Sequence, residues 1–170
     1  MTDLALHLER GPFWFGGAGI GNLLRPVSDD DARDTVDAAW DAGVRGFDTA
    51  PHYGLGLSER RLGVALAGRP RQEFLVSTKV GRVLVPGRGD GDDLASGGFA
   101  VPDDTVRQWD PSPSVVRRSL DESLGRLGLD HVDVAYLHDP DVYSLTDGLT
   151  QALPTLAELR DEGVVRAVGV

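Results

Sequence analysis

Short apolar segments alternate with amphipathic segments along this chain of 170 residues, and this order constrains its fold most. The apolar segments are typical of strands and lie near Trp14 to Ala18 and at 44–50, 73–80, 131–138 and 164–170. Apolar residues at helical spacing predict helices from Ser28 to Gly43 and at 59–68, 113–128 and 149–163. Strict alternation of strands and helices predicts a parallel sheet with right-handed crossovers, in a single α/β domain over residues 1–170.

Serines precede three of these helical segments and are expected to be their N-caps. They are Ser28, Ser58 and Ser112, the last of which is followed by proline. Pro154 lies inside the segment 149–163, where it either kinks the helix or marks its first turn. The segment between Gly81 and Pro111 is rich in Gly, Asp and Pro and shows no period, so it is expected to be either a functional lid or disordered.

Composition excludes several classes of function. The net charge of −10 argues against a general nucleic-acid-binding or anionic membrane surface. The chain has no cysteine, which excludes disulfides and thiolate metal sites, and its histidines show no recognised metal-ligand spacing. Charged residues near the N-terminus replace the apolar core of a signal peptide, and no apolar run has the ~18 residues of a membrane span. A cytoplasmic protein is therefore expected.

Four polar residues lie at or just past the carboxyl ends of predicted strands: Asp48, Tyr53, Lys79 and His138. Such strand ends carry the catalytic groups of parallel α/β barrels. Each residue also has an ordinary structural interpretation: a turn, a surface aromatic, a buried ion pair, or a capping or metal-binding imidazole. The competing fold is an open nucleotide-binding sheet, but the glycines of GGAGIGN do not lead directly into a helix.

The stretches GVRGFDTAPHYGLGLSERRLG, FLVSTKVGR and VDVAYLHDPD resemble the N-terminal part of an aldo/keto reductase. The stretches GNLLRPVSDDDA and HDPD are most similar to the bacterial branch of aldose 1-dehydrogenases, which oxidise L-fucose or D-threo-aldoses. The resemblance implies part of a (β/α)₈ TIM barrel, with about five strands and four helices present. It also implies an oxidoreductase that uses NADP or NAD and transfers hydride at a carbonyl or alcohol carbon, with oxidation of an aldose to its lactone as the expected reaction.

The resemblance assigns the catalytic roles to Asp48, Tyr53, Lys79 and His138. Tyr53 would exchange the proton, although an unperturbed phenol ionises only at about pH 10. The ammonium of Lys79 would favour the phenolate, Asp48 would hold that ammonium, and His138 would hydrogen-bond the substrate oxygen or relay the proton.

The resemblance places cofactor binding on Gly16, Gly17, Ala18 and Asp48, and no metal. The family often has Gly-Thr after its first strand, so Gly17 lacks a hydroxyl that would contact the cofactor or the substrate. Trp14 and Tyr143 are candidate aromatics for stacking on a sugar. Phe13, Phe15 and Trp40 are expected in the core instead.

A complete eight-stranded barrel needs about 250 residues, more than this chain has. A truncated gene product, a partial sequence or a deliberately shortened chain is therefore expected, inactive and weak in cofactor binding by itself, and self-associating through open barrel edges. Two alternatives stay open. One is a non-catalytic binding or scaffold subunit, and the other is a half-barrel that assembles with a partner. The expected ligand is a small carbonyl compound or sugar.

Overall fold

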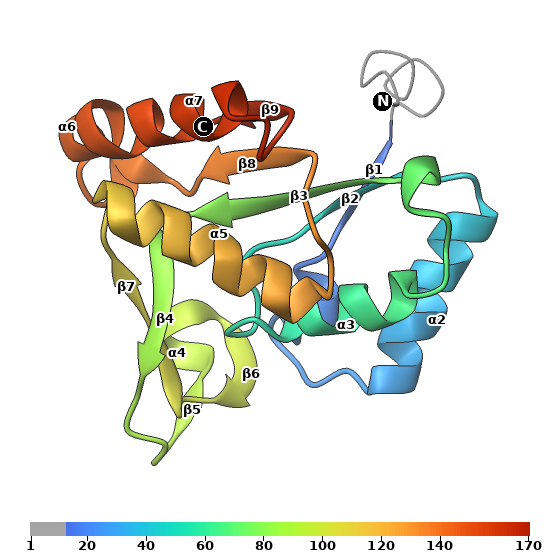
Figure 1. Cartoon of the computed structure of the whole chain (residues 1–170). Helices are drawn as coiled ribbons and strands as arrows, with labels where there is room; N and C mark the ends of the chain where they lie inside the picture. Colours follow the sequence, from blue (N-terminus) through green and yellow to red (C-terminus); the bar gives the residue numbers. More distant parts are fainter. Residues whose placement is uncertain (1–12) are drawn as a thin grey trace.

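A computed structural model describes residues 13–170 and contains a parallel sheet of five strands (Figure 1). The expectation that the N-terminus is not a signal peptide concerns residues that lie mostly outside 13–170. The sheet order β1-β2-β3-β8-β9 follows the chain order and confirms the predicted parallel α/β arrangement. Its strands are β1 (Trp14–Gly16), β2 (Gly46–Asp48), β3 (Leu75–Val80), β8 (Val134–Leu137) and β9 (Ala167–Gly169).

The two faces of the sheet differ in chemistry, because successive side chains of a strand point to opposite faces. Phe47, Val76 and Ala135 lie on the face that the helices cover, and each is fully buried. The opposite face carries polar side chains, and the register places Asp48 beside Ser77 and Lys79 beside Tyr136. In a barrel this polar face points inward, so the register already gathers the candidate site.

Four main helices cross over between the strands, close to the predicted segments: α2 (Asp29–Asp41), α3 (Leu57–Leu66), α5 (Pro113–Leu127) and α7 (Leu153–Asp161). A short helix α6 (Leu145–Asp147) and a π-helical turn (Gly148–Ala152) precede α7, and Pro154 lies in the first turn of α7. Single 3₁₀ turns occur at Gly19–Gly21, Arg71–Glu73 and Pro140–Val142.

Two of the three serine predictions agree with the helix starts. The hydroxyl of Ser28 accepts a hydrogen bond from the Asp31 amide at 3.0 Å, and Ser112 occupies the N-cap position of α5 without a side-chain bond. The prediction for Ser58 is wrong, because the N-cap of α3 is Gly56, two residues earlier, and the helix begins at Leu57. Gly56 has a φ of 79°, a left-handed conformation that glycine adopts without strain. Ser58 is thereby turned inward and is completely buried.

The segment between Gly81 and Pro111 is neither disordered nor a single open loop. It forms one antiparallel ribbon of β4 (Arg82–Pro86) with β7 (Thr105–Trp109), and a second of β5 (Asp92–Asp93) with β6 (Phe99–Pro102). The short helix α4 (Leu94–Gly97) joins β5 to β6. We call residues 82–109 the cap; it extends from the carboxyl end of β3 (Figure 1).

The core contains most of the residues that were expected there. Phe15 and Trp40 pack against buried residues, and Trp40 stacks on Phe47 with 6.4 Å between the ring centroids. Phe13 is an exception, since it lies directly before β1 and is 75% exposed. No helix among residues 13–170 is long and apolar enough to cross a membrane.

Candidate active site

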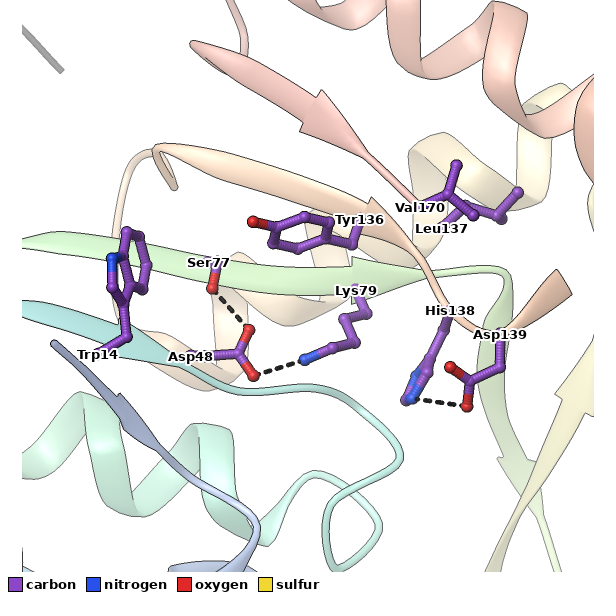
Figure 2. A pocket seen from close by; sticks show the side chains of 9 residues that line it. All are labelled: Trp14, Asp48, Ser77, Lys79, Tyr136, Leu137, His138, Asp139 and Val170. Carbon is purple, nitrogen blue, oxygen red and sulfur yellow. Dashed lines mark hydrogen bonds and ion pairs between the residues drawn. The ribbon is translucent and has the colours of Figure 1, made fainter. Parts of the chain in front are cut away.

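The centre of the polar face is an ion pair between neighbouring strands. Nζ of Lys79 lies 2.7 Å from Oδ2 of Asp48 and donates a second hydrogen bond to the Thr49 carbonyl oxygen at 3.0 Å. The other carboxylate oxygen of Asp48 accepts from the Ser77 hydroxyl at 2.6 Å. Figure 2 shows the contacts of the Asp48 carboxylate with Lys79 and Ser77 at the wall of the cavity. A lysine and an aspartate that are mostly shielded from water are thus held in one geometry.

Tyr53 lies directly beside this ion pair. Its ring centroid is 4.7 Å from Nζ of Lys79, within range of a cation–π contact. The His138 ring meets the Tyr53 ring edge to face, with 6.0 Å between the centroids. The structure therefore brings together all four residues that the sequence singled out, from β2, β3 and the loops after β2 and β8. The ammonium of Lys79 lies over the face of the Tyr53 ring.

Close backbone packing holds the Tyr53 loop, which is residues 49–56 between β2 and α3. The 3₁₀ turn after β1 approaches so closely that a Cβ built on Gly54 would lie 2.1 Å from the Gly21 carbonyl oxygen. A Cβ on Gly21 would in turn lie 2.9 Å from the Tyr53 carbonyl. Gly54 also has a φ of 62°. Glycine is required at both positions because any side chain would separate the turn from the loop.

His138 is buried, with only 5% of the residue exposed. Burial, with the nearby cations Arg82 and Lys79, lowers the pKa of His138 to about 2. Its Nδ1 is buried without a hydrogen-bond partner among the described residues, and Nε2 lies 3.6 Å from an Asp139 carboxylate oxygen. His138 is therefore neutral at any ordinary pH and can donate or accept one hydrogen bond.

A cavity of about 430 Å³ opens along this face, of a size that suits a small ligand. Nine residues line it, as Figure 2 shows: Trp14, Asp48, Ser77, Lys79, Tyr136, Leu137, His138, Asp139 and Val170. Ser77 and Tyr136 were missed from the sequence, although alternation with Lys79 along β3 and β8 would have indicated them. Trp14 lines the cavity, whereas Tyr143 stacks on Trp109 with centroids 5.0 Å apart and does not line it.

The glycines after β1 have different surroundings. A Cβ on Gly16 would meet nothing within 4 Å, so the backbone is open to a ligand there. A Cβ on Gly17 would lie 2.7 Å from both the Asp48 carbonyl oxygen and the Ser58 hydroxyl. That hydroxyl donates to the Gly17 carbonyl at 2.7 Å and lies 2.8 Å from the Thr49 hydroxyl. Packing thus explains why Gly17 lacks a side chain, and Ser58 supplies a hydroxyl in the same space.

The sequence did not indicate the other imidazole near the site. The His52 ring packs edge to face on His138, with centroids 5.2 Å apart. Burial and the guanidinium of Arg107 lower its pKa to about 4. In the sequence, the position of His52 directly before Tyr53 could have indicated that it lies near the site. Among residues 13–170, no three His, Asp, Glu or Cys side chains come together as a metal site would require.

Comparison with known proteins identifies the family. Residues 12–170 match the aldo/keto reductase family. The chain is 52% identical over 159 residues to D-threo-aldose 1-dehydrogenase from Pseudomonas sp, covering 92% of this chain and 48% of that protein. It is 37% identical over 158 residues to L-galactose dehydrogenase from Arabidopsis thaliana, covering 92% of this chain and 43% of that one.

Solved structures agree with this assignment. The aldo-keto reductase from Bacillus halodurans in its holo form superposes with a TM-score of 0.70 at 29% identity, over 92% of this chain and 44% of that one. The chain thus spans about half the length of the curated relatives it matches, and its sheet and helices are part of a TIM barrel. It belongs to the aldo/keto reductase family and is by ancestry an oxidoreductase.

Proposed function

We propose that the protein with this sequence oxidises an aldose at its anomeric carbon to a lactone, with NAD or NADP as the oxidant. The observation that carries this proposal is the position of Nζ of Lys79, which pairs with Asp48 while it lies 4.7 Å from the Tyr53 ring centroid. The similarity to an aldose dehydrogenase and to an L-galactose dehydrogenase supports the sugar as substrate.

A nicotinamide cofactor, when bound, would supply the acceptor for the hydride of the anomeric carbon. The chain's own residues handle the proton of the hydroxyl on that carbon, which passes to the Tyr53 phenolate in the oxidising direction. The ammonium of Lys79 stabilises the phenolate, because an adjacent positive charge favours the charged form of an acid. Asp48 holds the ammonium in place through its hydrogen bond of 2.7 Å.

His138 is suited to orient the substrate. A histidine that stays neutral cannot repel the neighbouring ammonium, and it still offers one hydrogen bond to the substrate oxygen. Gly16 pairs in register with Asp48 and leaves its backbone open, so that a flat ring can approach, and Trp14 supplies an apolar wall of the cavity. We therefore assign Gly16, Gly17 and Ala18, together with Asp48, to the nicotinamide end of the site.

The role of Tyr53 is tested in a chimera in which residues 1–170 are followed by the second half of the Pseudomonas enzyme. In this chimera Tyr53→Phe should lower turnover at least about a hundredfold, the size of general acid–base catalysis, and leave cofactor binding intact. Unchanged turnover would refute the proton transfer. A chimera that binds sugar and cofactor but has no turnover would instead support a binding or scaffold protein.

The cofactor affinity of the 170 residues alone is a separate proposal. Strands of one sheet and the loop after β8 wall the described cavity, and Val170, which also lines it, is 65% exposed. We therefore expect binding weaker than micromolar for both NAD and NADP. Titration followed by tryptophan fluorescence tests this, since Trp14 lines the cavity. Micromolar binding of either nucleotide would contradict the expectation.

We also propose that the chain associates with itself. Among the described strands, β1 and β9 each pair on one side alone, and unpaired parallel edges favour addition of further strands. Sedimentation velocity should show dimers or larger species at micromolar concentration. A monomer over the whole concentration range would oppose this proposal.

A further inference from the structure

The cap and the Tyr53 loop are joined by one buried arginine. Arg107 lies on β7, and its side chain is 10% exposed. Its Nη1 and Nη2 bind the two carboxylate oxygens of Asp93 at 2.6 and 2.5 Å, and the Asp93 side chain is 3% exposed. This bidentate pair is the strongest geometry available to an arginine and a carboxylate.

The same guanidinium reaches out of the cap. Nη2 of Arg107 also donates a hydrogen bond of 2.8 Å to the carbonyl oxygen of His52, the residue directly before Tyr53. A single cation thus satisfies a carboxylate of the cap and a backbone oxygen of the loop that carries the phenol. A Cβ on Gly97 would lie within 2.5 Å of both Arg107 and Asp93, so glycine at that position makes room for the pair.

Apolar packing also connects the cap to the Tyr53 loop. Phe99 on β6 is 2% exposed and forms a small separate core with Leu55 and Val101. The Phe99 ring meets His52 edge to face at 5.3 Å and tilts against Tyr53 at 6.1 Å between centroids. The Arg107 guanidinium lies 5.7 Å from the same ring. Ordering of the cap and of the Tyr53 loop therefore depends on the same side chains.

We propose that Arg107 is a positioning residue: by binding Asp93 and the His52 carbonyl together, it couples the fold of the cap to the placement of Tyr53. The proposal rests on the proposed function only in its kinetic consequence. The coupling itself is a property of the described structure, and it can be measured in a chain without turnover.

The first experiment is amide hydrogen exchange of the 170-residue chain. Arg107→Met removes both contacts, and Arg107→Lys keeps the charge but loses the fork that serves two partners. Exchange over residues 50–57 should be at least about tenfold faster in Arg107→Met, the effect of losing one charge-assisted hydrogen bond. Arg88→Ala is the matched control, because Arg88 is an exposed arginine in the same cap.

In this experiment Arg107→Lys should lie between the wild type and Arg107→Met, and α5 should exchange alike in all chains. Equal exchange of residues 50–57 in Arg107→Met and Arg88→Ala would overturn the coupling. So would faster exchange that extends equally to α5, because that result describes general destabilisation.

The second experiment measures kinetics in the chimera with the Pseudomonas second half. Misplacement of Tyr53 should lower kcat of Arg107→Met about tenfold or more at nearly unchanged KM for the cofactor, and Arg107→Lys should recover part of it. A rise in KM alone would overturn the positioning role. A wild-type chimera without turnover would refute the proposed function instead, and the exchange result would still decide the coupling.

Discussion

The ion pair between Asp48 and Lys79 permits a quantitative prediction. Their atoms are 2.7 Å apart, and the side chains are 27% and 15% exposed. At an effective dielectric constant of ~20, two unit charges at this distance attract by about 6 kcal/mol. Desolvation of both groups offsets most of that attraction, and hydrogen bonds to charged groups contribute about 1.5–3 kcal/mol. We therefore expect a coupling free energy of about 2 kcal/mol.

The assay is a double-mutant cycle of urea unfolding at about pH 7. It compares the wild type with Asp48→Ala, Lys79→Met and the double variant, and the cycle cancels the loss of the Ser77 contact with Asp48. Asp48→Ala alone should be the more destabilising of the single changes, because it leaves a shielded ammonium without a counter-ion among the described residues, held by the Thr49 carbonyl and the Tyr53 ring.

The control cycle uses Asp30 and Arg33, an exposed pair in α2 with atoms 2.8 Å apart. Such helix-surface pairs contribute about 0.3–0.5 kcal/mol. If the coupling between Asp48 and Lys79 does not exceed that of the control pair, the two groups do not form the electrostatic unit on which the proposed chemistry depends.

Three further results are expected from the structure. Gly54→Ala should destabilise the chain by at least about 2 kcal/mol in urea unfolding, because Gly54 has a left-handed φ and the added Cβ would lie 2.1 Å from a carbonyl oxygen. Gly125→Ala is the control: it lies in an open helical position and should stabilise the chain by about 0.5–1 kcal/mol. His138 has its pKa lowered to about 2, so the unfolded chain binds one more proton below about pH 6.5, and this group alone lowers stability on acidification by about 1.4 kcal/mol per pH unit, in addition to the contribution of His52, whose pKa is lowered to about 4. His138→Gln should reduce the total slope by that amount between about pH 6 and about pH 5, and an unchanged slope would show that this imidazole is not buried neutral. Ser58→Ala should lower the free energy of unfolding by about 1–3 kcal/mol, because the Gly17 carbonyl loses its hydrogen-bond donor. An unchanged midpoint of thermal unfolding would show that this hydrogen bond does not stabilise the fold.

The sequence by itself determined the order of strands and helices, because hydrophobic period and capping residues act within a few neighbours along the chain. It also indicated Asp48, Tyr53, Lys79 and His138, since parallel strands present their carboxyl ends at one edge. The N-cap of α3 is Gly56, two residues before the predicted Ser58, because contacts with Gly17 decided the burial of Ser58.

Only the tertiary structure determined the fold of the cap and the contacts of Arg107 with Asp93 and the His52 carbonyl. Two-stranded ribbons are marginal by themselves, so their local sequence carries little signal; here contacts with the Tyr53 loop stabilise them. Arg107 and His52 are 55 residues apart, and nothing in either segment predicts that a guanidinium will meet that carbonyl. Such pairings arise from the folding of distant segments against one another, and no local pattern encodes them.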